Sequence, residues 1–161
     1  MLPASDAAAP AALTLEPVHA EEDWQAVEGL FRIDHVEEDR RAGRSERSVA
    51  DTHAAALLRR GLEPVRYFAT RRRSRVAGCI GLWTRSDGVA MIEDVFVHPE
   101  ARGQGIATEM LRGVIGVARE RGAGPVLIGA EVDDTPKRLY ARFGFRPVVV
   151  TRSYSARAPD S

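Results

Sequence analysis

Residues 91–107 read MIEDVFVHPEARGQGIA, and this stretch predicts a β-strand, a glycine-containing loop and the start of a helix. Its first part is rich in β-branched and aromatic side chains, and Pro99 ends the strand because proline donates no ladder hydrogen bond. Apolar residues then recur at helical spacing, at Ile106, Met110, Val114 and Val117. The glycine loop is therefore expected at the N-terminus of a helix.

A loop in this position is suited to an anion. The first turn of a helix has unpaired N–H groups and the positive end of the helix dipole. Gly103 and Gly105 let a phosphate approach the backbone closely, and Arg102 adds a planar fork of donors. A diphosphate fits this description, although for a lone Gly-x-Gly a plain strand-to-helix turn with a surface arginine is the better interpretation.

The longer pattern resembles the acyl-coenzyme A motif Arg/Gln-x-x-Gly-x-Gly/Ala of the GNAT superfamily of N-acetyltransferases. Arg102, Gly105 and Ala107 fill its three fixed places. Residues 139–145, LYARFGF, are similar to a second family signature, a leucine-tyrosine pair followed by an aromatic-flanked glycine. The resemblance covers roughly residues 65–150.

The resemblance implies an α+β (α/β) fold with a mixed, mostly antiparallel sheet of six to seven strands and about four helices. Strands four and five would be parallel and splayed apart, with the pantetheine arm of acetyl-CoA, the co-substrate, in the gap. One N–H of the fourth strand, that of Val95, would polarise the thioester carbonyl. The implied donor-binding residues are Val95, Phe96, Val97, Arg102, Gly103, Gln104, Gly105, Ile106 and Ala107.

Tyr140 is the candidate general acid. Leu139 and Phe143 share one helix face, which leaves Tyr140 free to point toward the cleft, and its phenol is acidic enough to protonate a departing thiolate. The alternative is a tyrosine that packs at the rim of the fold.

Glu93 is the candidate general base, because it matches a Glu-Asp pair of several amine-acetylating members. Acting on an ammonium, it would need water or a raised pKa. Asp94 points to the opposite strand face unless a bulge intervenes. Either carboxylate could instead bind a lysine or arginine of the fold, so the base is left open between Glu93, Asp94 and water.

Residues 34–47 are highly charged, and the pattern fits either a fraying helix end or a solvated loop. In the GNAT fold this region often shapes the acceptor pocket, so its acidic residues could attract a cationic amine, opposed by the arginines among them. Solvation is the favoured interpretation for any single residue. The candidate acceptor-binding residues are Asp34, Glu38 and Asp94.

The rest of the chain predicts an ordered series of elements. Ser48 and Asp51 form a capping box at the start of a helix. Three strands with short connections form an antiparallel meander, and the strand after the central helix should lie parallel to the last of them. The expected elements are a strand at 13–18, helices from about Glu21 and from Val49 to about Arg60, strands at 65–70, 76–83, 89–97 and 126–130, a short helix from Pro136, and a last strand at 147–151.

Length and composition set the outer limits. With 161 residues and 44% hydrophobic, the chain is expected to form one domain at 12–154, between a disordered leader at 1–11 and a disordered tail at 155–161. Its 23 basic and 23 acidic residues cancel, which argues against nucleic acid or a membrane as partner. Four scattered histidines and one cysteine predict no metal and fit the cytoplasm.

These observations predict an acetyl-CoA dependent N-acetyltransferase that acts on a primary amine, expected to be that of a small molecule, in a ternary complex. A protein lysine or N-terminus is the alternative acceptor, and a noncatalytic acyl-CoA sensor is the alternative function. A dinucleotide-binding site is disfavoured because Thr108 occupies the place of the third glycine. The oligomeric state stays open, a homodimer included.

Overall fold

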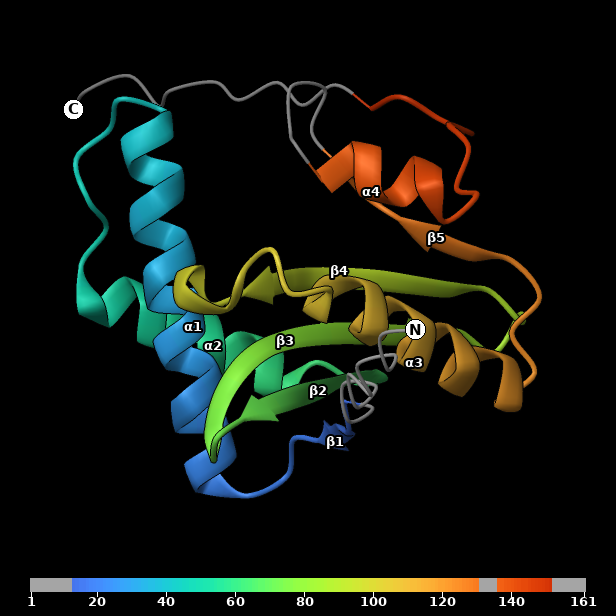
Figure 1. Ribbon diagram of the computed structural model, residues 1–161, viewed down its shortest axis with the longest axis horizontal. Helices are drawn as coiled ribbons and strands as arrows, with labels where there is room; N and C mark the ends of the chain where they lie inside the picture. Colours follow the sequence, from blue (N-terminus) through green and yellow to red (C-terminus); the bar gives the residue numbers. More distant parts are fainter. Residues whose placement is uncertain (1–12, 131–135, 152–161) are drawn as a thin grey trace, which may run out of the picture. The chain divides into compact units, whose positions relative to one another are not determined.

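The structure, a computed structural model, describes residues 13–130 and 136–151 and divides the chain into two compact units, residues 1–129 and 130–161. The first unit holds a five-stranded sheet in the order β1-β2-β3-β4-β5 (Figure 1). Its elements are β1 (Leu15–Pro17), α1 (Glu21–Arg41), α2 (Val49–Gly61), β2 (Val65–Arg72), β3 (Arg75–Thr84), β4 (Ala90–Val97), the 3₁₀ turn η1 (Pro99–Ala101), α3 (Ile106–Glu120) and β5 (Val126–Ile128).

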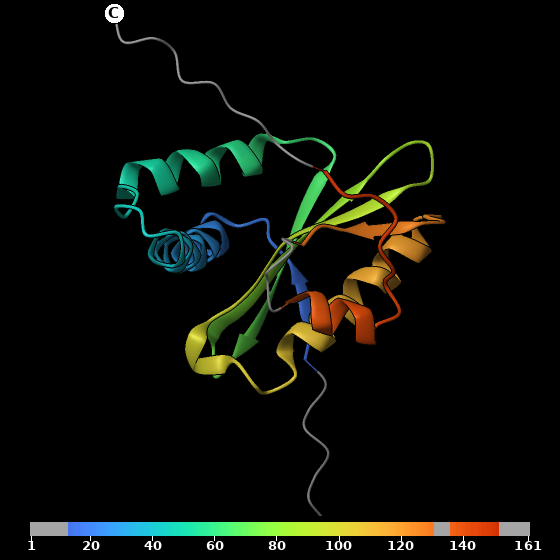
Figure 2. The same cartoon turned by 90° about the horizontal axis from the view of Figure 1, so that it is seen from above.

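The sheet has the predicted topology. β1 to β4 pair antiparallel in sequence order, and β5 pairs parallel to β4 after the α3 crossover. Figure 2 shows α1 and α2 on one face of the sheet and α3 on the other. A mixed α+β fold is therefore confirmed, as is the parallel pairing of the fourth and fifth strands.

The apolar faces of the helices account for the two layers. On α1 the predicted stripe turns inward, and Val27, Leu30 and Phe31 are buried. On α3, Ile106, Met110, Leu111 and Val114 are almost fully buried. Side chains on both sheet faces are removed from water in this way, which favours the fold by about 25 cal/mol for each Å² of apolar surface.

The predicted capping box is confirmed at the start of α2. The Ser48 side chain accepts a hydrogen bond from the Asp51 backbone N–H, and the Asp51 carboxylate accepts one from the Ser48 backbone N–H. Two N–H groups that the helix leaves unpaired are thereby satisfied.

The predicted count of six to seven strands is wrong for the described residues, which contain five. Residues 147–151 form no strand, although their β-branched sequence favours one. Val148, Val149 and Val150 are each about three-quarters exposed and pair with no other described segment. A strand requires a partner for its backbone groups, so β-propensity alone did not suffice.

The second unit contains α4 (Pro136–Arg142). The helix starts at Pro136 and is followed by Gly144 in a left-handed conformation, with φ +93°, as predicted. Its residue Tyr140 is buried, and the Tyr140 ring lies edge-on to that of Phe145 at 6.3 Å. The leader, the tail and the expected cap at Thr135 fall outside the described residues.

Two glycines give opposite predictions for stability. A Cβ at Gly78 of β3 would lie 2.9 Å from the Phe96 carbonyl oxygen and 3.0 Å from the Met110 side chain, whereas a Cβ at Gly116 of α3 would meet nothing within 4 Å. We expect Gly78→Ala to lower the free energy of unfolding by about 1–3 kcal/mol. Gly116→Ala should raise it by about 0.5–1 kcal/mol.

Urea denaturation of the two variants beside the wild type checks both values. If Gly78→Ala leaves the free energy of unfolding unchanged, the close approach of β3 and β4 at this position is contradicted. Gly116→Ala serves as the matched control, since it adds the same methyl group to the same protein.

Candidate active site

The glycine loop between η1 and α3 is a concave array of backbone donors. Gly103 and Gly105 both have left-handed backbones, with φ of +73° and +77°, which glycine adopts without strain. The N–H groups of residues 103–108 donate to no group of the residues that the structure describes. The loop is also exposed and lies at the positive end of a 15-residue helix. This arrangement can bind an anion such as a diphosphate.

Arg102 adds a positive charge whose position is fixed from three sides. Its Nε donates to the Val97 carbonyl oxygen at 3.1 Å, and its guanidinium lies over the Phe96 ring at 5.3 Å. Its Nη2 donates to Glu37 of α1 at 2.7 Å. The end of α1 and the end of β4 therefore meet at the glycine loop.

The open side of β4 begins in the middle of the strand. The parallel ladder with β5 covers Ala90 to Ile92, paired with Val126 to Ile128, and no described strand pairs with residues 93–97 on that side. Backbone groups on this side of the second half of β4 are thus available to an extended ligand that binds like an added strand, apart from the Val97 carbonyl oxygen, which accepts from Arg102. All three residues of β5 pair with β4, and residues 131–135 lie outside the described part of the chain, so the splay of the two strands stays a prediction.

A β-bulge marks the point where β4 opens. On β3, Cys79 pairs with Phe96 and Gly81 with Glu93, so Asp94 and Val95 together oppose Ile80. Asp94 has φ +47°, a left-handed conformation that is uncommon outside glycine and asparagine. The sequence placed Asp94 on the strand face opposite to Glu93 unless a bulge intervenes, and such a bulge is present.

The Asp94 carboxylate is saturated with donors. Arg59 of α2 donates to it from Nε at 2.7 Å and from Nη2 at 3.1 Å, and the Tyr67 hydroxyl of β2 donates a further short hydrogen bond. Tyr67 is buried, and burial together with the Asp94 charge raises the pKa of its phenol, so it stays a donor. Asp94 was a candidate for acceptor binding, but in this structure it binds residues of the fold.

Glu93 and Asp34 accept no hydrogen bond from a described residue, and the charges that oppose the rise of their pKa values are those of Arg59 and Arg41 respectively. Burial and then the Asp94 charge raise the pKa of Glu93, against the opposing effect of Arg59. Burial, followed by the charge of Glu38, raises the pKa of Asp34 from 3.8 to about 6. Asp34 accepts no hydrogen bond from, and forms no ion pair with, any other described residue. A half-buried carboxylate with a raised pKa can bind a cation or take up a proton at neutral pH.

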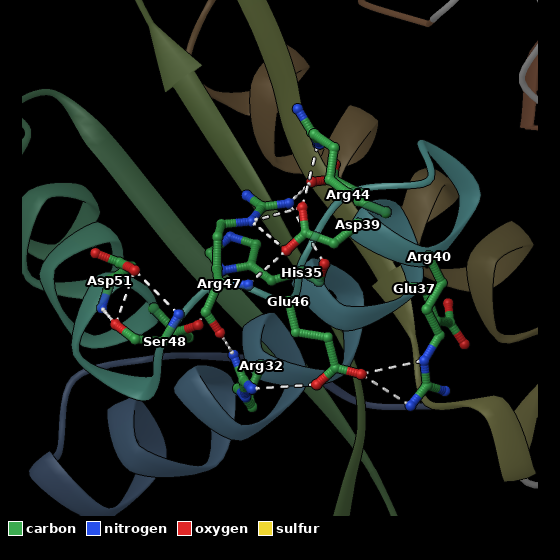
Figure 3. A network of polar contacts seen from close by, with 12 residues as sticks. Arg32, His35, Glu37, Asp39, Arg40, Arg44, Glu46, Arg47, Ser48 and Asp51 are labelled. Atoms are coloured by element: carbon green, nitrogen blue, oxygen red, sulfur yellow. Dashed lines mark hydrogen bonds and ion pairs between the residues drawn. The ribbon is translucent and has the colours of Figure 1, made fainter.

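The charged segment at residues 34–47 is more ordered than the sequence suggested. Residues 34–41 continue α1, and the connection to α2 is held by the polar network in Figure 3. Asp39 is only 2% exposed and accepts hydrogen bonds from the Arg47 backbone N–H at 2.8 Å and its Nε at 3.0 Å. These bonds lower the pKa of Asp39 to about 2. Asp39 is therefore neither solvated nor placed for an acceptor, because an arginine eight residues later binds it.

Glu38 is also drawn into this network. Arg47 donates to its carboxylate at 2.5 Å, and His35, one turn earlier, is buried against the Thr52 hydroxyl at 3.0 Å. Burial lowers the pKa of His35, so its imidazole is neutral at pH 7. Of the candidate acceptor-binding residues, only Asp34 therefore has a carboxylate without a hydrogen-bond donor in the described part of the chain.

Most predicted donor-binding residues come together in the first unit, along the second half of β4 and the glycine loop. Glu93 and Asp34 lie in the same unit, whereas Tyr140 lies in the second. Arg59 and Tyr67 were missed from the sequence, since each is ordinary for its helix or strand and gains importance only through Asp94. Among the described residues, no three His, Cys, Asp or Glu side chains gather as metal ligands would, and no helix is long and apolar enough to cross a bilayer.

The N–H groups at the start of α3 donate to no described residue and lie beside the open half of β4, an arrangement suited to a phosphate-bearing ligand with an extended arm. The chain belongs to the acetyltransferase (GNAT) family, whose sequence profile matches residues 24–145. This confirms the resemblance inferred from the two motifs. No curated protein matches the chain.

Solved structures of acetyltransferases share the fold at low sequence identity. A Trypanosoma brucei acetyltransferase is 20% identical, with a TM-score of 0.65 over 89% of this chain and 99% of its own. The aminoglycoside acetyltransferase AAC(6')-Iy, in complex with a bisubstrate analogue of coenzyme A, is 14% identical with a TM-score of 0.67 over 91% and 99%. The Acinetobacter haemolyticus enzyme AAC(6')-IG is 15% identical with a TM-score of 0.66 over 90% and 99%.

Proposed function

We propose that this protein transfers the acetyl group of acetyl-CoA to a primary amine of a small cationic molecule. The observation that carries the proposal is the run of N–H groups at residues 103–108 that donate to no described residue, next to the open half of β4. A diphosphate on these amides and on Arg102 would lead the pantetheine arm along Val97 and Val95. The coenzyme A analogue bound to AAC(6')-Iy, a protein of the same fold, supports this choice of donor.

The reaction needs a deprotonated amine and a polarised carbonyl. The amine lone pair attacks the thioester carbon, and the carbonyl oxygen becomes an oxyanion that the Val95 N–H stabilises. Glu93, whose pKa is raised, takes the amine proton through water. The C–S bond then breaks, and Tyr140 protonates the departing thiolate. The amide and free coenzyme A are the products.

The acceptor is proposed to be cationic because α1 changes from apolar to acidic along its inward stripe. Leu30 and Phe31 are buried in the core, and Asp34 follows one turn later, close enough to Asp94 of β4 for the two charges to interact. An ammonium group would pair with Asp34, whose carboxylate accepts no hydrogen bond from any described residue. A small polyamine or amino sugar carries such groups, and a protein lysine is the alternative acceptor.

Calorimetry with acetyl-CoA and a thiol-release assay over a panel of amines test the function. The wild type should bind acetyl-CoA and release coenzyme A with at least one cationic amine. Binding without release for every amine would favour the noncatalytic sensor, and no binding at all would overturn the proposal.

Arg102→Ala is expected to weaken acetyl-CoA binding about 10-fold, because it removes a charge-assisted contact to the diphosphate. The matched control is Arg112→Ala, which removes an exposed arginine paired with Glu109 on the same helix. The control should bind like the wild type. Equal binding by both variants would contradict the assignment of the loop, and isothermal titration calorimetry distinguishes the outcomes.

A further inference from the structure

We propose that Asp94 is a positioning residue: its carboxylate, bound by Arg59 and Tyr67, holds the β4 bulge in the left-handed conformation that keeps the strand open for the donor. This proposal rests on the proposed function and concerns the same site. It assigns to Asp94 neither the binding of the acceptor nor the transfer of a proton.

The bulge lies where the two halves of β4 differ. Before it, residues 90–92 pair with β5, and after it residues 93–97 have no described partner on that side. A change of φ at one residue turns the next peptide plane, so the conformation of Asp94 decides the direction of the Val95 N–H. The left-handed region costs an ordinary L-residue roughly 1–2 kcal/mol, and aspartate adopts it more readily than most residues when hydrogen bonds hold its side chain.

The contacts that hold Asp94 come from two distant parts of the chain. Arg59 lies 35 residues earlier and binds both carboxylate oxygens, while the Tyr67 hydroxyl binds Oδ2. Arg59 is itself fixed, since its guanidinium lies 5.1 Å from the centre of the Phe31 ring and donates to the Ala55 carbonyl. The bidentate pair fixes distance and direction together, as a single hydrogen bond would not.

Tyr67 is fixed as firmly. Its ring lies edge-on to Trp24 at 5.2 Å and to Phe31 at 6.0 Å. A Cβ at Gly81 would stand 3.2 Å from the same ring and 3.3 Å from the Glu93 carbonyl oxygen, so only glycine at that position lets the ring and the bulge meet without a shift. Elements α1, α2, β2 and β3 all contribute to the conformation of one residue.

The same contacts argue against a direct chemical role. Oδ2 accepts from Arg59 and Tyr67, and Oδ1 accepts from Arg59, so the charge of Asp94 is already compensated. A carboxylate whose charge is paired in this way attracts a cationic amine weakly. The role left to Asp94 is that of a clamp between α2, β2 and β4.

The test compares three substitutions at position 94 by calorimetry with acetyl-CoA, a measurement that needs no acceptor. Asp94→Ala loses the hydrogen bonds with Arg59 and Tyr67 and does not easily adopt φ +47°. Its Kd for acetyl-CoA should therefore rise about 10-fold. Asp94→Gly also loses the clamp but adopts this φ freely, and Asp94→Asn keeps both acceptor capacity and tolerance of the left-handed region. The Kd values of Asp94→Gly and Asp94→Asn for acetyl-CoA should lie within about threefold of the wild-type value. Each variant is measured well below its own unfolding temperature.

A second pair of variants removes the partner instead. Arg59→Gln should raise the Kd for acetyl-CoA about fivefold, whereas Arg60→Gln, which removes the neighbouring arginine that pairs with Glu21, should leave it unchanged. Equal Kd values for Asp94→Ala and the wild type would overturn the proposal. So would an equal rise of the Kd for acetyl-CoA in the glycine and alanine variants. A wild type that fails to bind acetyl-CoA would instead refute the proposed function.

Discussion

Tyr140→Phe is expected to lower kcat for acetyl transfer about 10²–10³-fold and to change the Kd for acetyl-CoA by less than about threefold. The variant keeps the aromatic ring that lies edge-on to Phe145 and removes only the hydroxyl. Without a general acid the sulfur must leave as a thiolate, and proton transfer to a leaving group contributes about 10²–10⁴-fold to catalysis. Steady-state thiol release, with calorimetry on the same preparation, separates the two quantities.

The matched control for Tyr140→Phe is Phe145→Leu, which disturbs the ring contact and keeps the hydroxyl. If Tyr140 only packs at the rim, Phe145→Leu should impair turnover more than Tyr140→Phe does. Wild-type kcat in Tyr140→Phe would remove the residue from the mechanism. The assignment rests on the leucine-tyrosine signature, since α4 belongs to the second unit.

Elements that depend on neighbouring residues could be predicted from the sequence. The capping box of α2 joins residues three apart, and the loop before α3 is specified by two glycines and the helical spacing that follows them. The meander of β2 to β4 needs only short connections. In each case the interacting residues are close in the chain, so a short stretch of sequence contains both partners of each interaction.

Features that depend on distant partners could not be predicted. Residues 34–41 look like a solvated segment until Arg47 folds back to bind the buried Asp39. Asp94 looks like a second acidic candidate until Arg59 and Tyr67 reach it from two other elements. A charged residue in a sequence has no visible partner, and its burial follows from tertiary structure alone.

Asp34→Asn is expected to lower kcat/KM for a cationic amine about 10- to 100-fold at pH 7.5, with little change in the Kd for acetyl-CoA. The variant keeps the shape of the side chain and removes the charge that would pair with the ammonium. The wild type should gain activity as the pH rises through about 6, the pKa of Asp34, because only the ionised form binds the amine. The variant should lack this rise.

The control is Glu22→Gln, an exposed position in the first turn of α1, which should leave the whole pH profile unchanged. Wild-type kcat/KM in Asp34→Asn at every pH would exclude a role for Asp34 with the acceptor. Activity that falls in both variants would point instead to the general negative charge of α1.

The stability of Asp34→Asn should change in the opposite direction to its activity. The pKa of Asp34 is raised from 3.8 to about 6 in the folded protein, so the folded state binds this proton more tightly than the unfolded chain does. That contribution to stability is complete below about pH 4 and is lost as the pH rises through about 6. Asp34→Asn should therefore raise Tm at pH 8 and leave it nearly unchanged at pH 4. If Asp34→Asn makes the protein more stable and less active, Asp34 serves ligand binding at the expense of stability. A lower Tm of Asp34→Asn at pH 8 would contradict this role.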